Sequence, residues 1–282
     1  MRPTSKIILG IFLSIFITSV LFIIGFSFSE RRNYNNHSSY FKSIPQDNPI
    51  GINVESFRVI VLEEDRTGVV IEEEKNGIIH TYVSYSESNG LTLNPITFGE
   101  ENKLFFPEAL NGFLAAKTNN DTLTIQIKVN ELRKIYGGGK DYMSFSGINF
   151  ALYTSNVNVV NRVNGFPVRV NNIETDSIKI FSCGDILIES CKAIVIDPVM
   201  DQNFRKLIVK NSVAQTIHLD LDRLGNWKLE GCDIGVENLT GSGRHHIIQH
   251  RNEKIKINWY PKNKDAELNI SVPGDTTQIV FQ

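Results

Sequence analysis

The sequence predicts an all-β protein whose C-terminal part is a β-solenoid. Two observations lead to this fold class. Helix-forming residues are scarce after the first thirty positions of the 282-residue chain, whereas β-branched residues broken by Asn, Gly and Asp recur throughout. Beyond residue 144, short strands that place two aliphatic residues on one face follow one another every seven to ten residues. Such thin apolar stripes are typical of stacked coils, and a β-sandwich is the alternative fold.

Charge and composition limit the class of protein. A formal net charge of −2 with 21% charged residues excludes a polybasic surface, so no nucleic-acid partner is expected. The 41% of hydrophobic residues suffices for the core of one large domain or two small ones. The chain divides into four predicted regions: an N-terminal membrane segment (1–29), a flexible linker (30–53), an N-terminal β region (54–135) and a solenoid region (136–282).

The N-terminal segment predicts a membrane anchor. Ile7–Phe28 contains no charged residue and, as a helix, reaches about 30 Å, the thickness of the hydrocarbon core of a bilayer. We expect a single-pass signal anchor in the cell envelope, with the C-terminal domain in the periplasm or outside the cell. The alternative is a signal peptide that is cleaved to release a secreted protein, since Ser27 and Ser29 are small residues of the kind that precede a cleavage site.

The N-terminal β region contains runs that alternate apolar and polar residues. The predicted strands are Phe57–Glu63, Gly68–Ile71, Ile78–Tyr85, Leu91–Asn94 and Thr122–Val129. The stretch Lys134–Lys140 (KIYGGGK) then interrupts the pattern and predicts a flexible loop or a joint between subdomains. It does not predict a phosphate-binding loop, because Asp141 stands where a magnesium-binding Ser or Thr is required and the glycine spacing does not match.

The segment Ser177–Met200 (SIKIFSCGDILIESCKAIVIDPVM) resembles three copies of one short sequence repeat. Ile178, Ile186 and Ile194 hold the same position of the repeat, and the residues two positions later hold a second shared position, which we call the aliphatic slots. A single coil cannot bury such a pair alone, but stacked coils make a continuous aliphatic column, which is the logic of a β-solenoid. The stretch DPVMDQNFRK, residues 197–206, departs from the spacing and predicts a bulged loop.

These patterns resemble a known family. The opening FRVIVLEEDRTGVVIEEE, the strand LTIQIKV, the FSGINF of Phe145–Phe150 and the run of short I-x-I units are similar to the bacterial GIN-domain proteins, also called the auto-transporter adhesin head domain family, of the envelope of Bacteroidetes-type bacteria. The resemblance covers Val54–Gln282. It implies a right-handed parallel β-helix exported to the cell envelope, without an enzymatic activity, and it carries over no functional residues.

Three cysteines cannot all pair with one another. With three strands per coil, Cys183, Cys191 and Cys232 fall on different faces, too far apart for the Cα separation of about 4.4–6.8 Å that a disulfide requires. We therefore expect three free cysteines, buried or half-buried at strand ends.

The histidines of SGRHHIIQHR form the densest cluster of metal-ligand type. In a strand, His246, Ile248 and His250 share a face with successive side chains about 7 Å apart along it, too far to chelate one ion. Gly241 and Gly243 together with the two isoleucines favour a strand. We interpret these residues and His245 as an exposed basic rim and predict no metal site.

Acidic residues lie outside the aliphatic slots. Asp220 and Asp222 alternate with leucines and are followed by Arg223, unlike a calcium loop, so we expect acids that face outward from a strand. A pectate-lyase-like β-helix would need acidic calcium ligands with a basic catalytic residue nearby. The acids that could serve are Asp185, Glu189 and Asp197, and the bases are Lys179, Lys192, Lys206 and Lys210.

The leading functional hypothesis is a non-enzymatic, membrane-anchored envelope protein that presents a rigid surface for binding or adhesion. We predict no catalytic residue, no cofactor and no metal, and an envelope protein or a glycan as ligand, whereas the oligomeric state is not predicted. The rival hypothesis is a polysaccharide-active β-helix enzyme or a carbohydrate-binding module. A cleft that gathers aromatic and acidic residues favours this rival, and a face of mixed Asn, Ser and Lys favours the scaffold.

Overall fold

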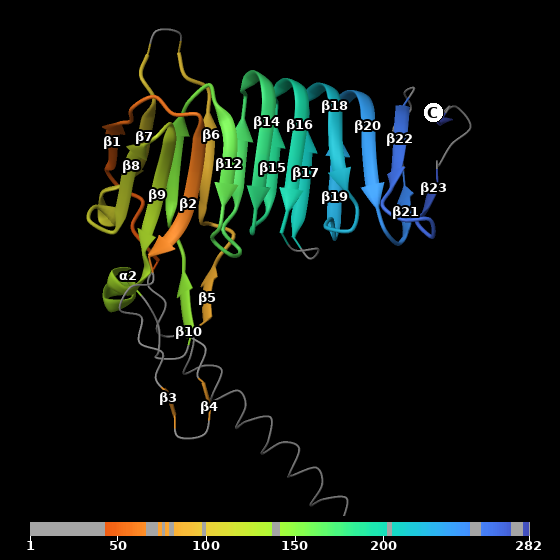
Figure 1. Cartoon of the computed structure of the whole chain (residues 1–282). Coiled ribbons are helices and arrows are strands. Elements are labelled where there is room, and N and C mark those ends of the chain that lie inside the picture. The colour runs from red at the N-terminus through yellow and green to blue at the C-terminus, as the bar shows by residue number, and fades with distance from the viewer. Residues whose placement is uncertain are drawn as a thin grey trace, which may run out of the picture.

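The computed structural model describes residues 43–65, 73–74, 77–78, 82–97, 100–136, 142–201, 205–248, 255–271 and 279–281 (Figure 1). In this part of the chain, nearly all of the structure is β, and the strands stack into an elongated solenoid. The predicted fold class is confirmed. The predicted membrane segment Ile7–Phe28 lies outside the described residues, and no helix within them is long and apolar enough to cross a membrane.

Two large sheets form opposite sides of the solenoid. The ten-stranded sheet has the order β24 (Ile279–Phe281), β22 (Ile255–Pro261), β20 (Asp233–Gly241), β18 (Val213–Asp220), β16 (Lys192–Met200), β14 (Glu174–Ser182), β12 (Val157–Asn161), β2 (Val59–Asp65), β9 (Thr122–Lys128) and β8 (Leu114–Asn119). The eight-stranded sheet has the order β1 (Pro49–Asn53), β7 (Lys103–Pro107), β11 (Asn149–Tyr153), β6 (Gly90–Asn94), β13 (Val168–Asn171), β15 (Ile186–Glu189), β17 (Lys206–Lys210) and β19 (Asn226–Glu230).

Smaller elements complete the described structure. They are the two-stranded sheets of β5 (Tyr82–Tyr85) with β10 (Tyr142–Phe145), β21 (Arg244–Ile248) with β23 (Glu267–Ser271) and β3 (Glu73–Glu74) with β4 (Gly77–Ile78), the 3-10 helix η2 (Glu108–Leu110) and the α-helix α2 (Val129–Tyr136). Among the strands predicted before residue 135, β2, β5, β6 and β9 confirm four, whereas Gly68–Ile71 lies outside the described residues.

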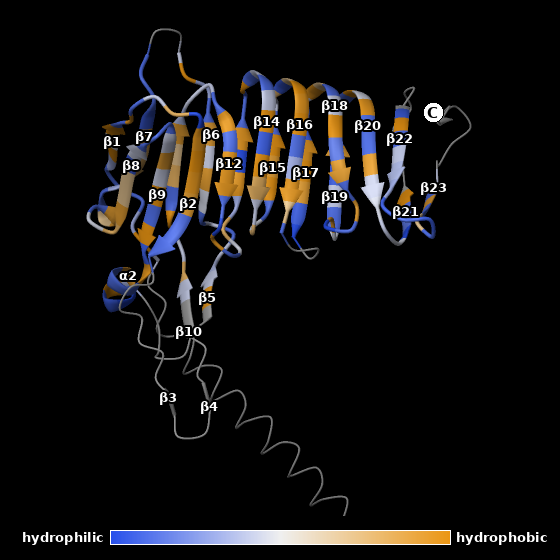
Figure 2. Cartoon of the chain, viewed as in Figure 1, coloured by the Kyte–Doolittle hydropathy of each residue, from blue (hydrophilic) through white to orange (hydrophobic). Residues whose placement is uncertain are grey.

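The core is an in-register column of aliphatic side chains. Val157, Ile178, Ile196 and Ile217 lie directly over one another at intervals of 18 to 21 residues, and each is fully buried. Because side chains alternate between the two faces of a strand, the residues that flank each of these four within its own strand point away from the core. Figure 2 shows this alternation of apolar and polar residues along the strands.

Parallel pairing rules out the β-sandwich. From β12 to β24, every described pairing between neighbouring strands is parallel. Antiparallel pairs occur among the described residues only where β1 meets β7, β7 meets β11, β8 meets β9 and β3 meets β4. The less regular N-terminal β region therefore ends the solenoid with antiparallel strands, while β2 and β6 belong to the same sheets as the later coils.

Ile178, Ile186 and Ile194 do not hold equivalent core positions, so this part of the sequence interpretation was wrong. Ile178 stacks on Ile196, and Ile186 stacks on Leu207. Ile194 is instead 45% exposed. In β16 the alternation shifts by one residue, so that Ala193 and Ile196 both point inward with two residues between them.

Two predicted loops are also partly regular structure. β16 continues to Met200, through the first four residues of the stretch predicted as a bulged loop. Residues 134–136 form the end of helix α2, and residues 137–141, with the three glycines, lie outside the described part of the chain.

One corner of the solenoid repeats a backbone conformation that the sequence patterns did not reveal. Asn172, Ser190, Asn211 and Gly231 follow the ends of four successive strands of the eight-stranded sheet, and each has a φ between 47° and 61°. This left-handed conformation turns the chain toward the next sheet, and Gly and Asn adopt it most readily. The residue that follows is buried in each case: Ile173, Cys191, Ser212 and Cys232.

This corner explains why cysteines occupy two of the turns. The Sγ of Cys191 donates to the carbonyls of Val170 and Glu189, and Cys232 makes the equivalent contacts with Val209 and Glu230 two coils later. A small side chain with a weak donor fits a position that is buried beside turn carbonyls.

All three cysteines are free, as expected, but the geometric reason given above was wrong for two of them. Cys191 and Cys232 occupy the same corner, with Ser212 in the coil between them. Two strand spacings separate the cysteines by about 9–10 Å, which exceeds the reach of a disulfide. Cys183 lies in another turn, where its Sγ is 3.6 Å from the Asp201 carboxylate.

Replacing Gly231 by Ala should destabilise the solenoid by about 1–2 kcal/mol, because Ala is strained at a φ of 61° and its Cβ would lie 2.6 Å from the Asn211 Oδ1. The matched control is Gly243→Ala, whose Cβ would meet nothing closer than 4.0 Å. Urea unfolding followed by circular dichroism measures both. Equal midpoints for the two variants would contradict the left-handed corner.

Thiol labelling should find three reactive cysteines in the unfolded, non-reduced protein, because no pair is close enough to bond. In the folded protein, Cys183 should react first, since Cys191 and Cys232 are buried. Burial raises the pKa of both the Cys183 and the Cys191 thiol, so the difference in exposure sets the order of reaction. A count of one thiol after unfolding would show that two of the cysteines are paired.

Candidate binding site on the N-terminal coils

The outer face of the eight-stranded sheet is hollowed where β1, β7 and β11 lie side by side. The hollow has a volume of about 670 Å³. This is within the range of about 300–1,000 Å³ that is usual for small-ligand sites. Its lining residues are Pro49, Asn53, Glu100, Glu101, Lys103, Phe105, Ala151 and Tyr153.

Strand register brings these side chains together. Gly51, Phe105 and Ala151 face one another across the three strands, and Asn53, Lys103 and Tyr153 form a second row. The two rows are two residues apart along each strand and therefore share the outer face. Between them, Leu104 and Leu152 point inward and are fully buried in the core. The core thus fixes the backbone beneath the hollow.

Two aromatic rings form an angled corner in the hollow. The ring centroids of Phe105 and Tyr153 are 5.4 Å apart, and the ring planes meet at 76°. The Phe105 ring leans over Gly51, where a Cβ would lie 2.6 Å from the Phe105 Cε1. Lys103 places its Nζ 5.5 Å from the centre of the same ring. The Phe105 ring is therefore held from three sides, while Tyr153 remains 39% exposed.

Polar groups surround the aromatic corner. The Asn53 Nδ2 donates to the Glu101 Oε2 at 2.9 Å, and both residues are exposed. Glu100 and Lys103 are exposed as well. With two carboxylates and one ammonium group, the hollow has a negative balance of charge and offers both donors and acceptors.

No pattern in the sequence indicated this hollow. Phe105 and Tyr153 are 48 positions apart and become neighbours only because β7 pairs antiparallel with β11. Neither residue was among the candidate residues above.

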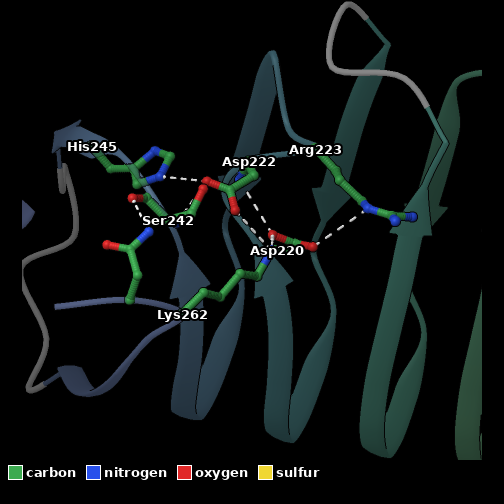
Figure 3. A network of polar contacts seen from close by, with 7 residues as sticks. Asp220, Asp222, Arg223, Ser242, His245 and Lys262 are labelled. Carbon is green, nitrogen blue, oxygen red and sulfur yellow. Dashed lines mark hydrogen bonds and ion pairs between the residues drawn. The ribbon is translucent and has the colours of Figure 1, made fainter. Parts of the chain in front are cut away.

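A second cluster of polar side chains joins the C-terminal coils (Figure 3). The Asp222 carboxylate accepts hydrogen bonds from the Lys262 Nζ and from the Ser242 backbone N–H, each at 2.8 Å. It also contacts the His245 Nε2 at 3.0 Å. Lys262 also donates to Asp220, which forms a further ion pair with Arg223 at 3.6 Å. The cluster ties together residues from β18, the following turn, β21 and the end of β22.

These contacts perturb the protonation of Asp222. Partial burial acts to raise its pKa, but the hydrogen bonds from Lys262, Ser242 and His245 outweigh burial and hold the pKa far below the ordinary value of 3.8. The two carboxylates in turn raise the pKa of Lys262 against the opposite effect of its burial. The charges therefore neutralise one another, and the cluster acts as a clamp between coils.

The structure separates the predicted histidine cluster. β21 confirms the predicted strand, but His245 is half-buried against Asp222 rather than part of an exposed rim. His246 is exposed, with its Nε2 3.3 Å from the Ser271 Oγ, and His250 lies outside the described residues. Within the described residues, no three His, Cys, Asp or Glu side chains are grouped so that they could hold a metal ion.

The remaining candidate residues form ladders between coils. Asp220 ends β18, so that Asp222 lies in the turn and not on the strand as expected. Lys192 pairs with Glu174 at 2.6 Å, and Lys210 pairs with Glu230 at 3.4 Å. Lys179 stacks beside Asp197, Glu189 stacks beside Lys210, and the Asp185 carboxylate accepts a bond from the backbone N–H of Lys206. These acids and bases lie along several strands and do not converge on one point.

Comparisons with known proteins concern the fold. No protein-family model matches this sequence, and no curated protein matches it. A solved structure of a "putative adhesin" from Bacteroides fragilis is similar, with 15% identity and a TM-score of 0.46 over 84% of this chain and 99% of the other.

Two structures from Parabacteroides each match 83% of this chain with a TM-score of 0.36. One is a "putative adhesin" from Parabacteroides merdae, with 9% identity over 95% of its length, and the other a "putative lipid binding protein" from Parabacteroides distasonis, with 10% identity over 97%. Two of the three structures are thus named as adhesins and one as a lipid binding protein. At such identities and TM-scores they assign neither a family nor a function to this chain, and membership of the GIN-domain family stays a prediction.

Replacing Asp222 by Asn should lower the free energy of unfolding at pH 7 by about 1–3 kcal/mol, because Lys262 loses a charged partner in the clamp. The pKa of Asp222 is lowered by folding, so its contribution is present above pH 3.8 and declines as the pH falls below that value. The deficit of the variant should therefore shrink in acid. Denaturant titrations at pH 7, 5 and 3 measure it, with the exposed Asp265→Asn as control. A deficit of the same size at every pH would contradict the charge-based clamp.

Proposed function

We propose that the chain is a non-enzymatic, membrane-anchored protein of the cell envelope that presents a rigid β-solenoid surface for binding or adhesion. The observation that carries this proposal is the hollow with Phe105 and Tyr153 on the outer face of the sheet. Aromatic side chains that are fixed in place and accessible to solvent are the commonest energetic anchors of binding sites. A smaller hollow of about 240 Å³ contains the exposed Tyr260, but among the described residues it lacks a second ring in contact with that tyrosine of the kind that Phe105 and Tyr153 form.

Rigidity supports a binding role. Each strand under the hollow is paired on both sides except β1, and the inward residues are locked in the core. A surface that is already ordered loses little conformational entropy when a ligand binds, so more of the contact energy appears as affinity. A stacked solenoid provides this order over a long surface without a closed cavity.

The anchor in the proposal rests on the sequence. The uncharged segment Ile7–Phe28 and the Asn- and Ser-rich linker that follows would tether the solenoid outside the membrane. The resemblance to the GIN-domain family supports the same location. Cleavage of the segment, with secretion of the solenoid, is the alternative outcome.

The rival hypothesis of a β-helix enzyme finds less support. The acids named for such an enzyme, Asp185, Glu189 and Asp197, do not converge with the lysines on one point. Asp220 and Asp222 are neutralised by Lys262 and Arg223. A carboxylate with a strongly lowered pKa is a poor proton acceptor near neutral pH. We therefore expect no depolymerisation of an acidic glycan by the purified protein.

In cells that express the full-length chain, the protein should remain in the membrane pellet after a carbonate wash, and protease added to the periplasmic side should cleave it.

The same chain, immobilised on beads, should retain fragments of the cell envelope, because the rings of the hollow are available for contact. The double variant Phe105→Ala/Tyr153→Ala should retain at least fivefold less. Tyr260→Ala is the matched control, since Tyr260 is 52% exposed but lies on β22 near the other end of the solenoid.

Release of the chain by carbonate would remove the anchor from the proposal. Equal retention by the double variant and by wild type would show that the hollow does not bind, and depolymerisation of a glycan would replace the binding role by an enzymatic one.

A further inference from the structure

We infer that the ligand of the hollow at Phe105 and Tyr153 is an uncharged carbohydrate chain. This inference rests on the proposed binding function and adds the chemical class of the ligand and its place on the solenoid. It follows from the shape of the aromatic corner, from the mixture of donors and acceptors around it and from the balance of charge.

The aromatic corner matches the shape of a sugar ring. A pyranose has one face of C–H groups that packs on an aromatic ring, while its hydroxyl groups project sideways from the edge. Phe105 and Tyr153 meet at 76°, so one ring can lie under the C–H face while the other flanks the sugar. The small side chain of Ala151 leaves room above the sheet, while the Phe105 ring occupies the space above Gly51.

The polar rim matches the edge of a sugar. Each sugar hydroxyl donates one hydrogen bond and accepts others, so a sugar site needs both kinds of partner close to the stacking rings. Glu100 and Glu101 accept, whereas the amide of Asn53 and the ammonium group of Lys103 donate. The bond from Asn53 to Glu101 holds both groups in place before a ligand arrives.

Charge selects an uncharged chain over an acidic one. The two carboxylates of the hollow exceed the single positive charge of Lys103, which lies against the Phe105 ring. A uronic acid or a sulfated sugar would bring further negative charge to this rim and be repelled. A neutral hexose or N-acetylhexosamine chain meets no such penalty.

The openness of the hollow disfavours an acyl chain. The glutamates and Asn53 at the rim are exposed, so a bound hydrocarbon would have polar groups and water beside it. Another hollow of about 570 Å³ crosses β14, β16, β18 and β20. Its lining contains no aromatic residue, so it lacks a stacking surface for sugars. The hollow of Phe105 and Tyr153 is the better site for a glycan.

Isothermal titration calorimetry tests the inference with the full-length chain in a polyoxyethylene detergent, which has no sugar headgroup. The probes are the neutral oligosaccharides maltohexaose, cellohexaose and chitohexaose, and the acidic hexamer of galacturonic acid. We expect at least one neutral probe to bind saturably and the acidic hexamer to bind at least tenfold more weakly.

Variants then locate the site. Tyr153→Ala should weaken binding of the neutral probe at least tenfold. Gly51→Ala should weaken it at least threefold, because the added Cβ displaces the Phe105 ring while every lining side chain stays present. Tyr260→Ala should bind as wild type does. Thermal unfolding of each variant verifies that the loss is not a loss of fold.

The outcomes separate this inference from the proposed function. Binding of no neutral probe, stronger binding of the acidic hexamer, or wild-type affinity in Tyr153→Ala would each overturn the glycan assignment. If envelope fragments are still retained by wild type and lost by Phe105→Ala/Tyr153→Ala, the hollow binds a ligand of another class. If that retention also fails, the proposed function falls with the inference.

Discussion

The in-register stacking of inward aliphatic side chains is the constraint on which the rest of the molecule depends. One coil places too few apolar residues inward to form a core of its own, so its stability comes from the coils above and below. Parallel hydrogen bonds fix the vertical alignment of Val170, Ile188 and Val209 on one side of the column. A slip of one residue would turn each aliphatic side chain out to solvent. The same register therefore also fixes every row of outward side chains.

Outward rows in the regular coils are suited to holding coils together. Lys192 with Glu174 and Lys210 with Glu230 form ion pairs between neighbouring strands, each worth at most about 1 kcal/mol at an exposed position. The cluster of Asp220, Asp222 and Lys262 is less exposed and spans more than one coil. Charged side chains on these faces thus serve the stack itself, which explains why the acids and bases do not converge on a reacting centre.

Much of the fold could be predicted from the alternation of apolar and polar residues, because this alternation within a single strand shows which of its faces is buried. The coil length could not be predicted in this way. The spacing of eight residues between Ile178 and Ile186 separates two strands on opposite sides of one coil, whereas the coil itself takes 18 to 21 residues. The left-handed corner at Ser190 and Gly231 is a better marker of the coil, but it varies among Asn, Ser and Gly. Glu237 also interrupts the aliphatic pattern of the column in the sequence, since it is fully buried between Ile217 and Ile257.

The candidate site was beyond prediction from the sequence because it arises where the repeat ends. In the regular coils of the eight-stranded sheet, the parallel strands carry a long side chain at the outward positions of this row, as at Arg169, Leu187 and Ile208. At the N-terminal end, β7 turns antiparallel to both neighbours and sets Phe105 between Gly51 and Ala151. The small side chain of Ala151 beside the large Phe105 ring leaves a depression that a long side chain in this row would fill. The antiparallel end thus gives the outer face of this sheet a depression where the repeat is broken, and the break costs the stack little, because no further described coil stacks on β1.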